Sequence, residues 1–183
     1  MALKATIFKA NLAISDVDRG YYATHPLTLA RHPSETDERM MLRLLAFALH
    51  ANDGLAFGRG LSADDEPALW RRDATGAIDT WIDVGLPDER LVRRASGRAR
   101  NVVVYAYGGR AVDLWWSRNA GPLQRLRNLT VLAVPPVAVH ALAAFAARTM
   151  QLQCTLQDGH IWLSDSVATV PIELVRFFRG GDA

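Results

Sequence analysis

Cysteine and lysine are the residues that this 183-residue sequence most lacks. Its single cysteine, Cys154, excludes an internal disulfide and any zinc site built from several cysteines. Hydrophobic runs are also short: residues 129–139 and 141–147 are the longest candidates, whereas a membrane-spanning helix needs about 18 residues. The opening residues MALKATIFKA show neither the apolar core nor the small-residue cleavage site of a secretory signal. We therefore expect a cytoplasmic protein that has no membrane partner.

The sequence does contain enough apolar material for one domain. Half of its residues are hydrophobic, which suits a folded core and is too much for a disordered chain. A typical domain has roughly 150 residues, so we expect residues 1–183 to form a single domain. The sequence leaves the oligomeric state open, and a monomer is compatible with it.

Charge is distributed unevenly along the chain, although the formal net charge is only +2. Eight of the 19 acidic residues lie between positions 62 and 89, and nine arginines follow between positions 90 and 127. This order is compatible with a metal-binding face beside an anion-binding face. It is equally compatible with solvated surface charge that balances on average, so the two interpretations remain open.

The apolar periodicity predicts an α/β fold with a mixed β-sheet flanked by helices. Ser34 is the expected cap of the first helix. The continuous apolar run of residues 102–107 is typical of a buried parallel strand, and Asp158-Gly159 predicts a tight hairpin turn. The expected strands are residues 5–14, 21–30, 55–60, 68–73, 78–84, 102–107, 129–134, 152–157, 160–164 and 170–177. The expected helices are residues 34–51, 88–100, 112–119 and 135–148.

The hairpin of residues 68–84 carries acidic side chains in a suggestive pattern. Alternate residues of a strand share a face, so Asp79, Trp81 and Asp83 lie on one face of the second strand. At a rise of about 3.3 Å per residue, Asp79 and Asp83 are about 13 Å apart and cannot bind the same ion. A metal ion at either aspartate therefore needs a second carboxylate from elsewhere.

The hairpin register supplies a candidate for that second carboxylate. If Asp73 pairs with Ile78, Glu66 becomes a diagonal neighbour of Asp83, about 7–8 Å away between backbone positions. Two carboxylates at this separation can share Mg²⁺, which completes its ligands with water and phosphate oxygens. In the alternative interpretation, Glu66 and Asp65 lie on a solvated loop and Asp83 caps the end of a strand.

Over nearly its whole length, the chain resembles the YaeQ family of bacterial proteins. The segments that carry the resemblance are MALKATIFKA (1–10), LTLARHPSETDERMMLRLLAF (27–47), GLSADDEP (60–67), AIDTWIDVGLPDERLVRRA (77–95), RTMQLQ (148–153) and QDGHIWLSD (157–165). The resemblance implies a restriction-endonuclease-like fold, a variant of the PD-(D/E)xK nucleases. It also implies a core over residues 33–134, with the hairpin of residues 4–31 and the segment 135–178 as elaborations.

The resemblance further implies roles for individual residues. Glu66 stands at the first acidic position and Asp83 at the second. Glu38, or alternatively Glu35, stands for the glutamate of the preceding helix. Gly85 occupies the position of the nuclease lysine, whose charge stabilises the phosphate or orients the attacking water. The loss of that lysine is compatible both with a migrated site and with an inactive enzyme.

Two functions follow from these assignments. In the first, a Mg²⁺-dependent nuclease or phosphodiesterase, Glu66 and Asp83 hold the ion and Glu38 supports it, while Asp65 and Asp79 tune the local charge. In the second, the chain binds nucleic acid or a protein on the same scaffold without cleaving it.

Basic and aromatic side chains are the candidates for contact with nucleic acid. Arg93 and Arg94 lie on the predicted helix after the hairpin, where either can supply the displaced positive charge or bind the phosphate backbone. Arg39 lies on the first predicted helix and is a further candidate. Trp115 and Trp116 either stack on bases or pack as core and rim of a helix.

Other patterns point to no additional chemistry. The histidines are scattered without metal-ligand spacing, and no serine lies in a nucleophile motif, so a zinc site or a hydrolase triad is not expected. We expect Arg43 to form an exposed pair with the glutamates of its helix, which contributes little to stability.

Overall fold

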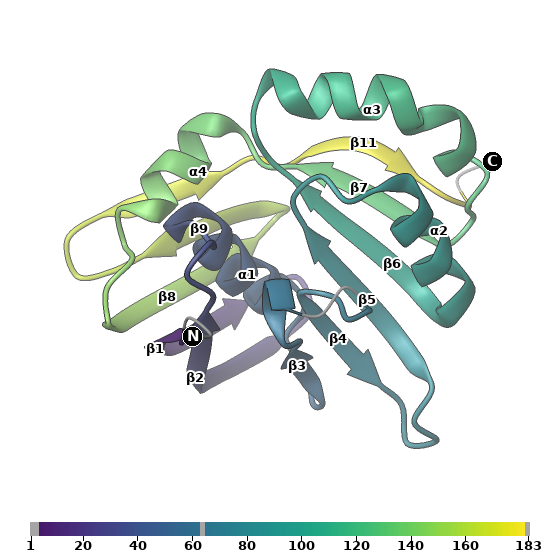
Figure 1. The fold of residues 1–183 in the computed structure, drawn as a ribbon. Helices are drawn as coiled ribbons and strands as arrows, with labels where there is room; N and C mark the ends of the chain where they lie inside the picture. The colour runs from purple at the N-terminus through teal and green to yellow at the C-terminus, as the bar shows by residue number, and fades with distance from the viewer. Residues whose placement is uncertain (1–3, 63–64, 182–183) are drawn as a thin grey trace.

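The computed structural model of the protein contains two mixed β-sheets with one helix packed between them (Figure 1). It describes residues 4–62 and 65–181. The strands are β1 (Thr6–Asp16), β2 (Tyr21–Arg31), β3 (Leu55–Phe57), β4 (Leu69–Arg72), β5 (Ile78–Val84), β6 (Ala99–Ala106), β7 (Leu129–Ala133), β8 (Thr149–Gln157), β9 (His160–Ser164), β10 (Thr169–Ile172) and β11 (Val175–Arg179). The helices are α1 (Asp37–His50), α2 (Glu89–Arg98), α3 (Arg110–Leu123), α4 (Pro136–Ala143) and the 3₁₀ turn η1 (Gly60–Ser62).

The first sheet joins the two ends of the chain, with the strand order β10-β9-β8-β1-β2. β1 and β2 form the predicted hairpin, and β8 pairs with β1 in parallel. β8 and β9 turn at Asp158 and Gly159, whose φ angles of 53° and 76° are those of a tight hairpin turn. The two predicted hairpins are therefore confirmed.

The second sheet has the strand order β11-β7-β6-β5-β4-β3. β3, β4 and β5 are antiparallel, while β6 and β7 continue the sheet in parallel through the crossover helices α2 and α3. In β6, Val103 and Tyr105 face α1, whereas Val102 and Val104 face α2 and α3. Both faces of β6 are thus covered, which confirms the buried parallel strand that its unbroken apolar run predicts.

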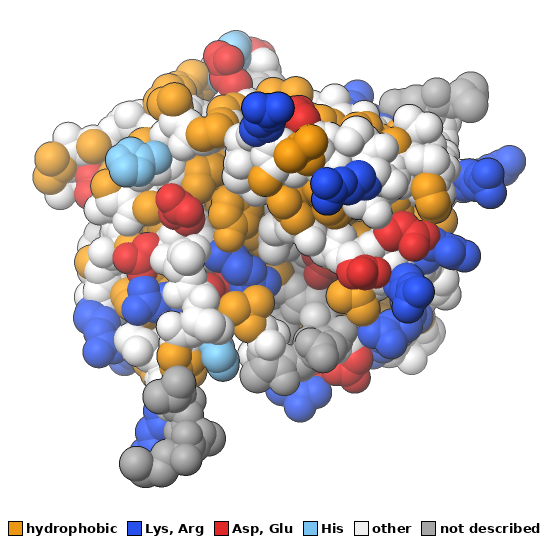
Figure 2. All heavy atoms as spheres, turned by 45° about the horizontal axis from the view of Figure 1, so that its top comes forward, with side chains coloured by type: hydrophobic (Ala, Val, Ile, Leu, Met, Phe, Trp, Pro, Cys, Tyr) orange, Lys and Arg blue, Asp and Glu red, His pale blue; other side chains and the backbone are white. Residues whose placement is uncertain are grey.

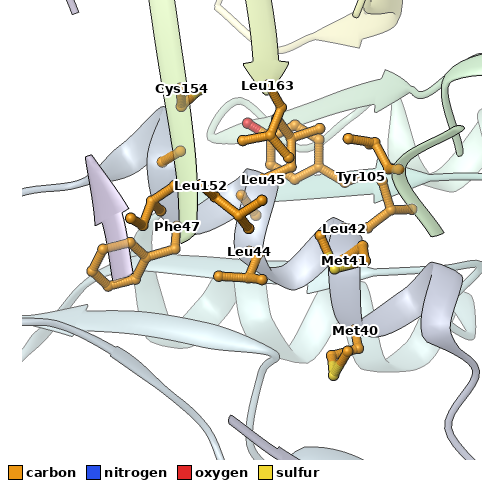
Figure 3. Packing of buried hydrophobic residues seen from close by; sticks show 14 of the residues in the cluster. Met40, Met41, Leu42, Leu44, Leu45, Phe47, Tyr105, Leu152, Cys154 and Leu163 are labelled. Carbon is orange, nitrogen blue, oxygen red and sulfur yellow. The ribbon is translucent and has the colours of Figure 1, made fainter. Parts of the chain in front are cut away.

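Helix α1 is the shared core of both sheets. Residues 40–48 are all buried, because the first sheet and α4 cover one side of the helix and the second sheet covers the other. Figure 3 shows Leu44 and Leu45 of α1 in the same hydrophobic cluster as Leu152 of β8 and Leu163 of β9. A helix buried on nearly all sides explains why its middle reads as almost continuously apolar.

Several details differ from the sequence prediction. The helix expected over residues 135–148 is too long, because α4 ends at Ala143 and β8 begins at Thr149. The mixed α/β class is confirmed, but the strands form two sheets instead of one. The single strand expected over residues 170–177 is wrong, because β10 joins the first sheet and β11 the second. Helix α1 is capped by Thr36, whose hydroxyl oxygen accepts a hydrogen bond from the backbone N–H of Arg39, and not by Ser34.

Among the helices that the structure describes, none combines the length and the apolar character that crossing a membrane requires. The cytoplasmic location and the division into a core with terminal elaborations stay predictions of the sequence.

Candidate functional site

A cavity of about 230 Å³ opens at the carboxyl end of β5, between α1, the segment before β4 and the start of α2. In open α/β sheets, this end of the parallel strands is where ligands bind. Four of the predicted site residues line the cavity: Arg39 of α1, Glu66 before β4, Asp83 of β5 and Arg94 of α2. We call it the β5 cavity.

The register of β4 against β5 determines which side chains meet in this cavity. Trp70 lies opposite Trp81, as the predicted register requires. Nearer the turn, Ile78 pairs with Arg72 and not with Asp73, because a β-bulge offsets the strands by one residue there. The pairing assumed at the turn is therefore wrong, whereas the register at the site end is confirmed.

Asp83 is the more deeply placed of the two carboxylates. Burial raises the pKa of its carboxyl group, while a hydrogen bond from Trp81, the charge of Arg39 and a backbone hydrogen bond from Ala68 act in the opposite direction. The indole Nε1 of Trp81 donates to Asp83 Oδ2 at 3.0 Å. Since Trp81 is only 6% exposed, its packed ring holds this carboxylate in a defined position.

Glu66 already has a cationic partner. The backbone N–H of Arg59 donates to Glu66 Oε2 at 3.0 Å, and the Nε of Arg59 donates to Oε1 at 2.9 Å. These hydrogen bonds hold the pKa of Glu66 below its usual value. Glu66 is therefore ionised at neutral pH and enters the cavity as a charged acceptor.

A buried ion network fixes Arg39. Arg39 Nη1 donates to Glu35 Oε1 at 2.7 Å, and Arg43 binds both oxygens of Glu35 at 2.8 and 2.7 Å. The exposed pairing expected of Arg43 is wrong: this side chain is 2% exposed and also donates to the backbone oxygen of Ala30. Glu35 is therefore occupied with the two arginines, and it orients Arg39 for the cavity.

Gly85 has a backbone conformation that few other residues adopt. Its φ is +119°, and its N–H donates to the backbone oxygen of Tyr105 at 2.9 Å. A lysine at this position would strain the backbone. The positive charges that line the β5 cavity come instead from Arg39 and Arg94.

Two other predicted site residues form ion pairs outside the described lining of the β5 cavity. Asp79 is paired with Arg71, and hydrogen bonds from Arg71 and Thr80 keep its pKa low. Arg93 pairs with Glu89 one helical turn earlier, at 3.2 Å. The structure thus separates the neighbours Arg93 and Arg94 by position: of the two, Arg94 lines the cavity.

Glu38 and Asp65 also lie outside the described lining of the cavity. Asp65 is exposed, and its backbone oxygen accepts a hydrogen bond from Arg98. Within residues 4–62 and 65–181, no group of three or more His, Cys, Asp or Glu side chains is placed to hold a metal ion. Among the described acids, Glu66 and Asp83 are the two that line the β5 cavity.

Three leucines of the cavity were not expected from the sequence. Leu61, Leu86 and Leu91 line it while remaining 42%, 37% and 38% exposed. Scattered exposed leucines are common, so none of them gives a signal of its own. Only the fold brings them together as an apolar rim around the charged groups.

The architecture and the cavity define a class of mixed α/β protein, with two sheets around a buried helix and a charged cavity at the end of a central parallel strand. The chain belongs to the YaeQ protein family, which matches residues 1–174.

Similar proteins match this chain over nearly their whole lengths. The "Uncharacterized protein YaeQ" of Escherichia coli (strain K12) is 48% identical, covering 97% of this chain and 98% of that protein, and its counterpart in Salmonella typhi is 49% identical with the same coverage. The crystal structure of the YaeQ protein from Xanthomonas axonopodis pv. citri is 52% identical with a TM-score of 0.92, covering 96% of this chain and 99% of that one. The YaeQ protein structure from Pseudomonas syringae is 36% identical with a TM-score of 0.91, covering 95% and 96%. The family predicted from the sequence is confirmed.

Proposed function

We propose that this protein is a Mg²⁺-dependent phosphodiesterase that acts on nucleic acid at the β5 cavity. One observation carries the proposal: the carboxylates of Glu66 and Asp83 and the guanidinium groups of Arg39 and Arg94 line one cavity. Carboxylates are ligands for a hard divalent cation, and arginines are donors to phosphate oxygens. The cavity therefore offers both halves of a phosphodiester site.

The order of elements around the cavity supports the proposal. α1 precedes the antiparallel strands β3, β4 and β5, and α2 then leads to β6, which is parallel to β5. The PD-(D/E)xK nucleases that the family resemblance implies have the same succession: a helix, a hairpin that carries acidic residues, a second helix and a strand. Glu66 and Asp83 stand at the two acidic positions of that succession.

The two carboxylates retain acceptor capacity for an ion. A carboxylate has about four lone-pair sites. Asp83 receives hydrogen bonds from Trp81 and the Ala68 backbone, and Glu66 receives them from the backbone and side chain of Arg59. Mg²⁺ uses one or two protein carboxylates and completes its octahedron with water and phosphate oxygens. Bound there, it would polarise the phosphate and lower the pKa of a coordinated water.

The remaining groups of the cavity suit the substrate. Arg39 is held by Glu35, so its guanidinium is preorganised for a phosphate oxygen. Arg94 offers a second group of donors from α2, and Leu61 and Leu91 add apolar surface to the lining. Figure 2 shows acidic and basic side chains interspersed over the visible face. We therefore assign the selection of a phosphate to these two arginines of the cavity.

One observation favours a second function, in which the cavity binds nucleic acid or a protein without cleavage. Gly85 stands where the nuclease lysine belongs, and its φ of +119° disfavours a side chain there. A guanidinium stays protonated at neutral pH, so Arg94 can replace the charge of that lysine but not its proton transfer.

A cleavage assay tests the proposal. Labelled single-stranded and duplex oligonucleotides are incubated with the chain in Mg²⁺, in Mn²⁺ or in EDTA. We expect cleavage that EDTA abolishes and that Asp83→Asn and Glu66→Gln each reduce by about 100-fold, because each removes a charged ligand of the ion.

Asp113→Asn is the matched control, since Asp113 is an exposed acid on α3 outside the described lining of the cavity. It should leave the cleavage rate unchanged. Cleavage that persists in Asp83→Asn would not depend on the β5 cavity, and it would therefore contradict the proposal. Binding without cleavage by the unaltered chain would support the second function instead.

A further inference from the structure

A second cavity adjoins the β5 cavity across Leu86 and Pro87, which line both. It has a volume of about 490 Å³ and is also bordered by Trp115 and Asn119 of α3. We call it the Trp115 cavity. Leu86 and Pro87 are the lining residues that the two cavities share, so a ligand that spans both would pass over these two residues.

The aromatic wall of the Trp115 cavity is fixed in position. Trp115 is half-buried, and its indole Nε1 donates to the backbone oxygen of Pro87 at 2.8 Å. Asn119 Nδ2 donates to the backbone oxygen of Trp115 at 2.7 Å, which leaves the amide Oδ1 as an acceptor. The fixed indole of Trp115 can stack on a planar ring, such as a nucleic-acid base. The neighbouring amide oxygen can accept a hydrogen bond from a donor at the edge of that ring.

The charges of the two cavities differ. The β5 cavity contains Arg39 and Arg94, which attract phosphate. The Trp115 cavity is lined by Asp88 and Glu89, with Arg90 as its cation. The β5 cavity also contains the acids Glu66 and Asp83, but the proposed function assigns these to Mg²⁺, which leaves two arginines for a phosphate. In the Trp115 cavity a single arginine lies with two acids, which disfavours a phosphate and offers acceptors to the amino groups of a neutral base. The pair of cavities is therefore complementary to one nucleotide unit, with its phosphate on one side and its base on the other.

We infer that the substrate is single-stranded nucleic acid, with a phosphate in the β5 cavity and the adjacent unpaired base against Trp115. This inference rests on the proposed phosphodiester site. A base can reach the indole only when it is not paired and stacked, since extruding it from a duplex costs a few kcal/mol. The sugar between phosphate and base then lies against Leu86 and Pro87, which line both cavities. Stacking on an aromatic ring tolerates any base, so little sequence preference is expected.

Fluorescence anisotropy of the unaltered chain in EDTA tests this inference, because binding is then measured without cleavage. The probes are a labelled single strand, the same strand with abasic positions at its centre, and a hairpin duplex of equal length. All three carry phosphates, but only the first offers unpaired bases throughout. We expect the single strand to bind about tenfold more tightly than either of the others, as stacking of one to two bases would give.

Matched tryptophan variants locate the effect. Trp115→Leu should remove most of the preference for the intact single strand. Trp162→Leu should retain it, because Trp162 is a half-buried tryptophan of β9 in the other sheet. If Trp115→Leu does not fold, Leu86→Ser provides the test at an exposed rim position, with Leu114→Ser of α3 as its control.

The outcomes separate this inference from the proposed function. Equal affinity for the intact and the abasic strand would overturn the inference and leave the phosphodiester site standing. The absence of binding to all three probes would overturn the inference, and the cleavage assay in Mg²⁺ would then decide the proposed function on its own. Base-dependent binding by a chain that does not cleave in Mg²⁺ would support the inference and contradict the catalytic proposal alone.

Discussion

At the scale of single residues, the β5 cavity depends on side chains that hold other side chains. Glu35 fixes Arg39 through one carboxylate oxygen and Arg43 through both. Trp81 fixes Asp83 in the same way, through its indole N–H. Because Glu35 and Arg43 are almost fully buried, the removal of one partner would leave the other as an uncompensated charge.

The first prediction concerns this buried pair. Glu35→Ala should lower the free energy of unfolding by about 3–5 kcal/mol, because Arg43 would remain buried without its counter-ion. Urea denaturation measures the loss. Glu89→Ala is the control: it removes the acid of a pair whose arginine, Arg93, is largely exposed, so it should cost less than about 1 kcal/mol. Equal losses in the two variants would contradict this account.

The second prediction concerns Gly85. Gly85→Ala should destabilise the protein by about 1–3 kcal/mol through backbone strain, because the φ of this residue is +119°. A steric clash is not the cause, since the atom of Tyr107 nearest to an added Cβ is 4.0 Å away. Gly97 provides the opposite case: it lies in α2 with nothing within 4 Å of an added Cβ. Gly97→Ala should therefore stabilise the helix by about 0.5–1 kcal/mol. Thermal unfolding of both variants measures the difference. A Gly85→Ala variant more stable than the unaltered chain would contradict the proposed backbone strain.

Sequence reasoning reached only part of the site at this scale. Alternation along a strand and the family resemblance selected Glu66 and Asp83, which the fold does bring to one cavity. The burial of Arg43 was missed because helical spacing gives the face of a residue but not what covers that face. Arg93 and Arg94 could not be told apart either, since the ion pair that diverts Arg93 depends on side-chain direction.

At the scale of elements, the sequence located most helices and strands but not all of their ends or partners. Ser34 and Thr36 are both good caps, and the choice depends on local competition: Ser34 Oγ bonds His32 Nδ1 at 2.6 Å, whereas Thr36 Oγ1 accepts from the N–H of Arg39 at 3.1 Å. The two-residue hydrophobic period likewise locates strands in the sequence but does not show which strands pair with each other. The division of the last segment into β10 and β11 therefore required the fold.

A third prediction concerns the contact between α1 and β6. His50 of α1 and Tyr105 of β6 are hydrogen-bonded at 2.6 Å between Nε2 and Oη. Burial, reinforced by the charge of Arg19, lowers the pKa of His50 from 6.5 to about 4. The unfolded chain therefore binds a proton at a higher pH than the native one. The contribution of neutral His50 to the free energy of unfolding should be fully present above about pH 6.5. It should fall by up to about 3 kcal/mol as the pH decreases to about 4.

Urea unfolding at a series of pH values between 7 and 4 measures this loss. In His50→Gln the proton-linked part of the slope should disappear, because the buried titrating group is gone. His140→Gln, which changes an exposed histidine of α4, should keep the slope of the unaltered chain. Parallel curves for His50→Gln and the unaltered chain would show that His50 does not carry the effect.

At the scale of the whole molecule, the site lies where three layers meet: α1, the second sheet and α2. The sequence predicted the mixed α/β class but not the division into two sheets, because β8 pairs with β1 from the far end of the chain. Local periodicity contains no information on such a pairing. The fold also brings members of the acidic and basic blocks of the sequence together, pairing Arg93 with Glu89 and Arg100 with Asp73.

The central claim is that the β5 cavity binds nucleic-acid phosphate, and two adjacent arginines of α2 test it most directly. Arg94 lines the cavity, whereas Arg93 pairs with Glu89 outside it. The measurement is the affinity of a labelled single strand over a range of salt concentrations in Arg94→Ala and Arg93→Ala. We expect Arg94→Ala to weaken binding severalfold and to lower the salt slope by about one, with Arg93→Ala close to the unaltered chain. Equal effects of the two variants, or none from Arg94→Ala, would contradict the claim.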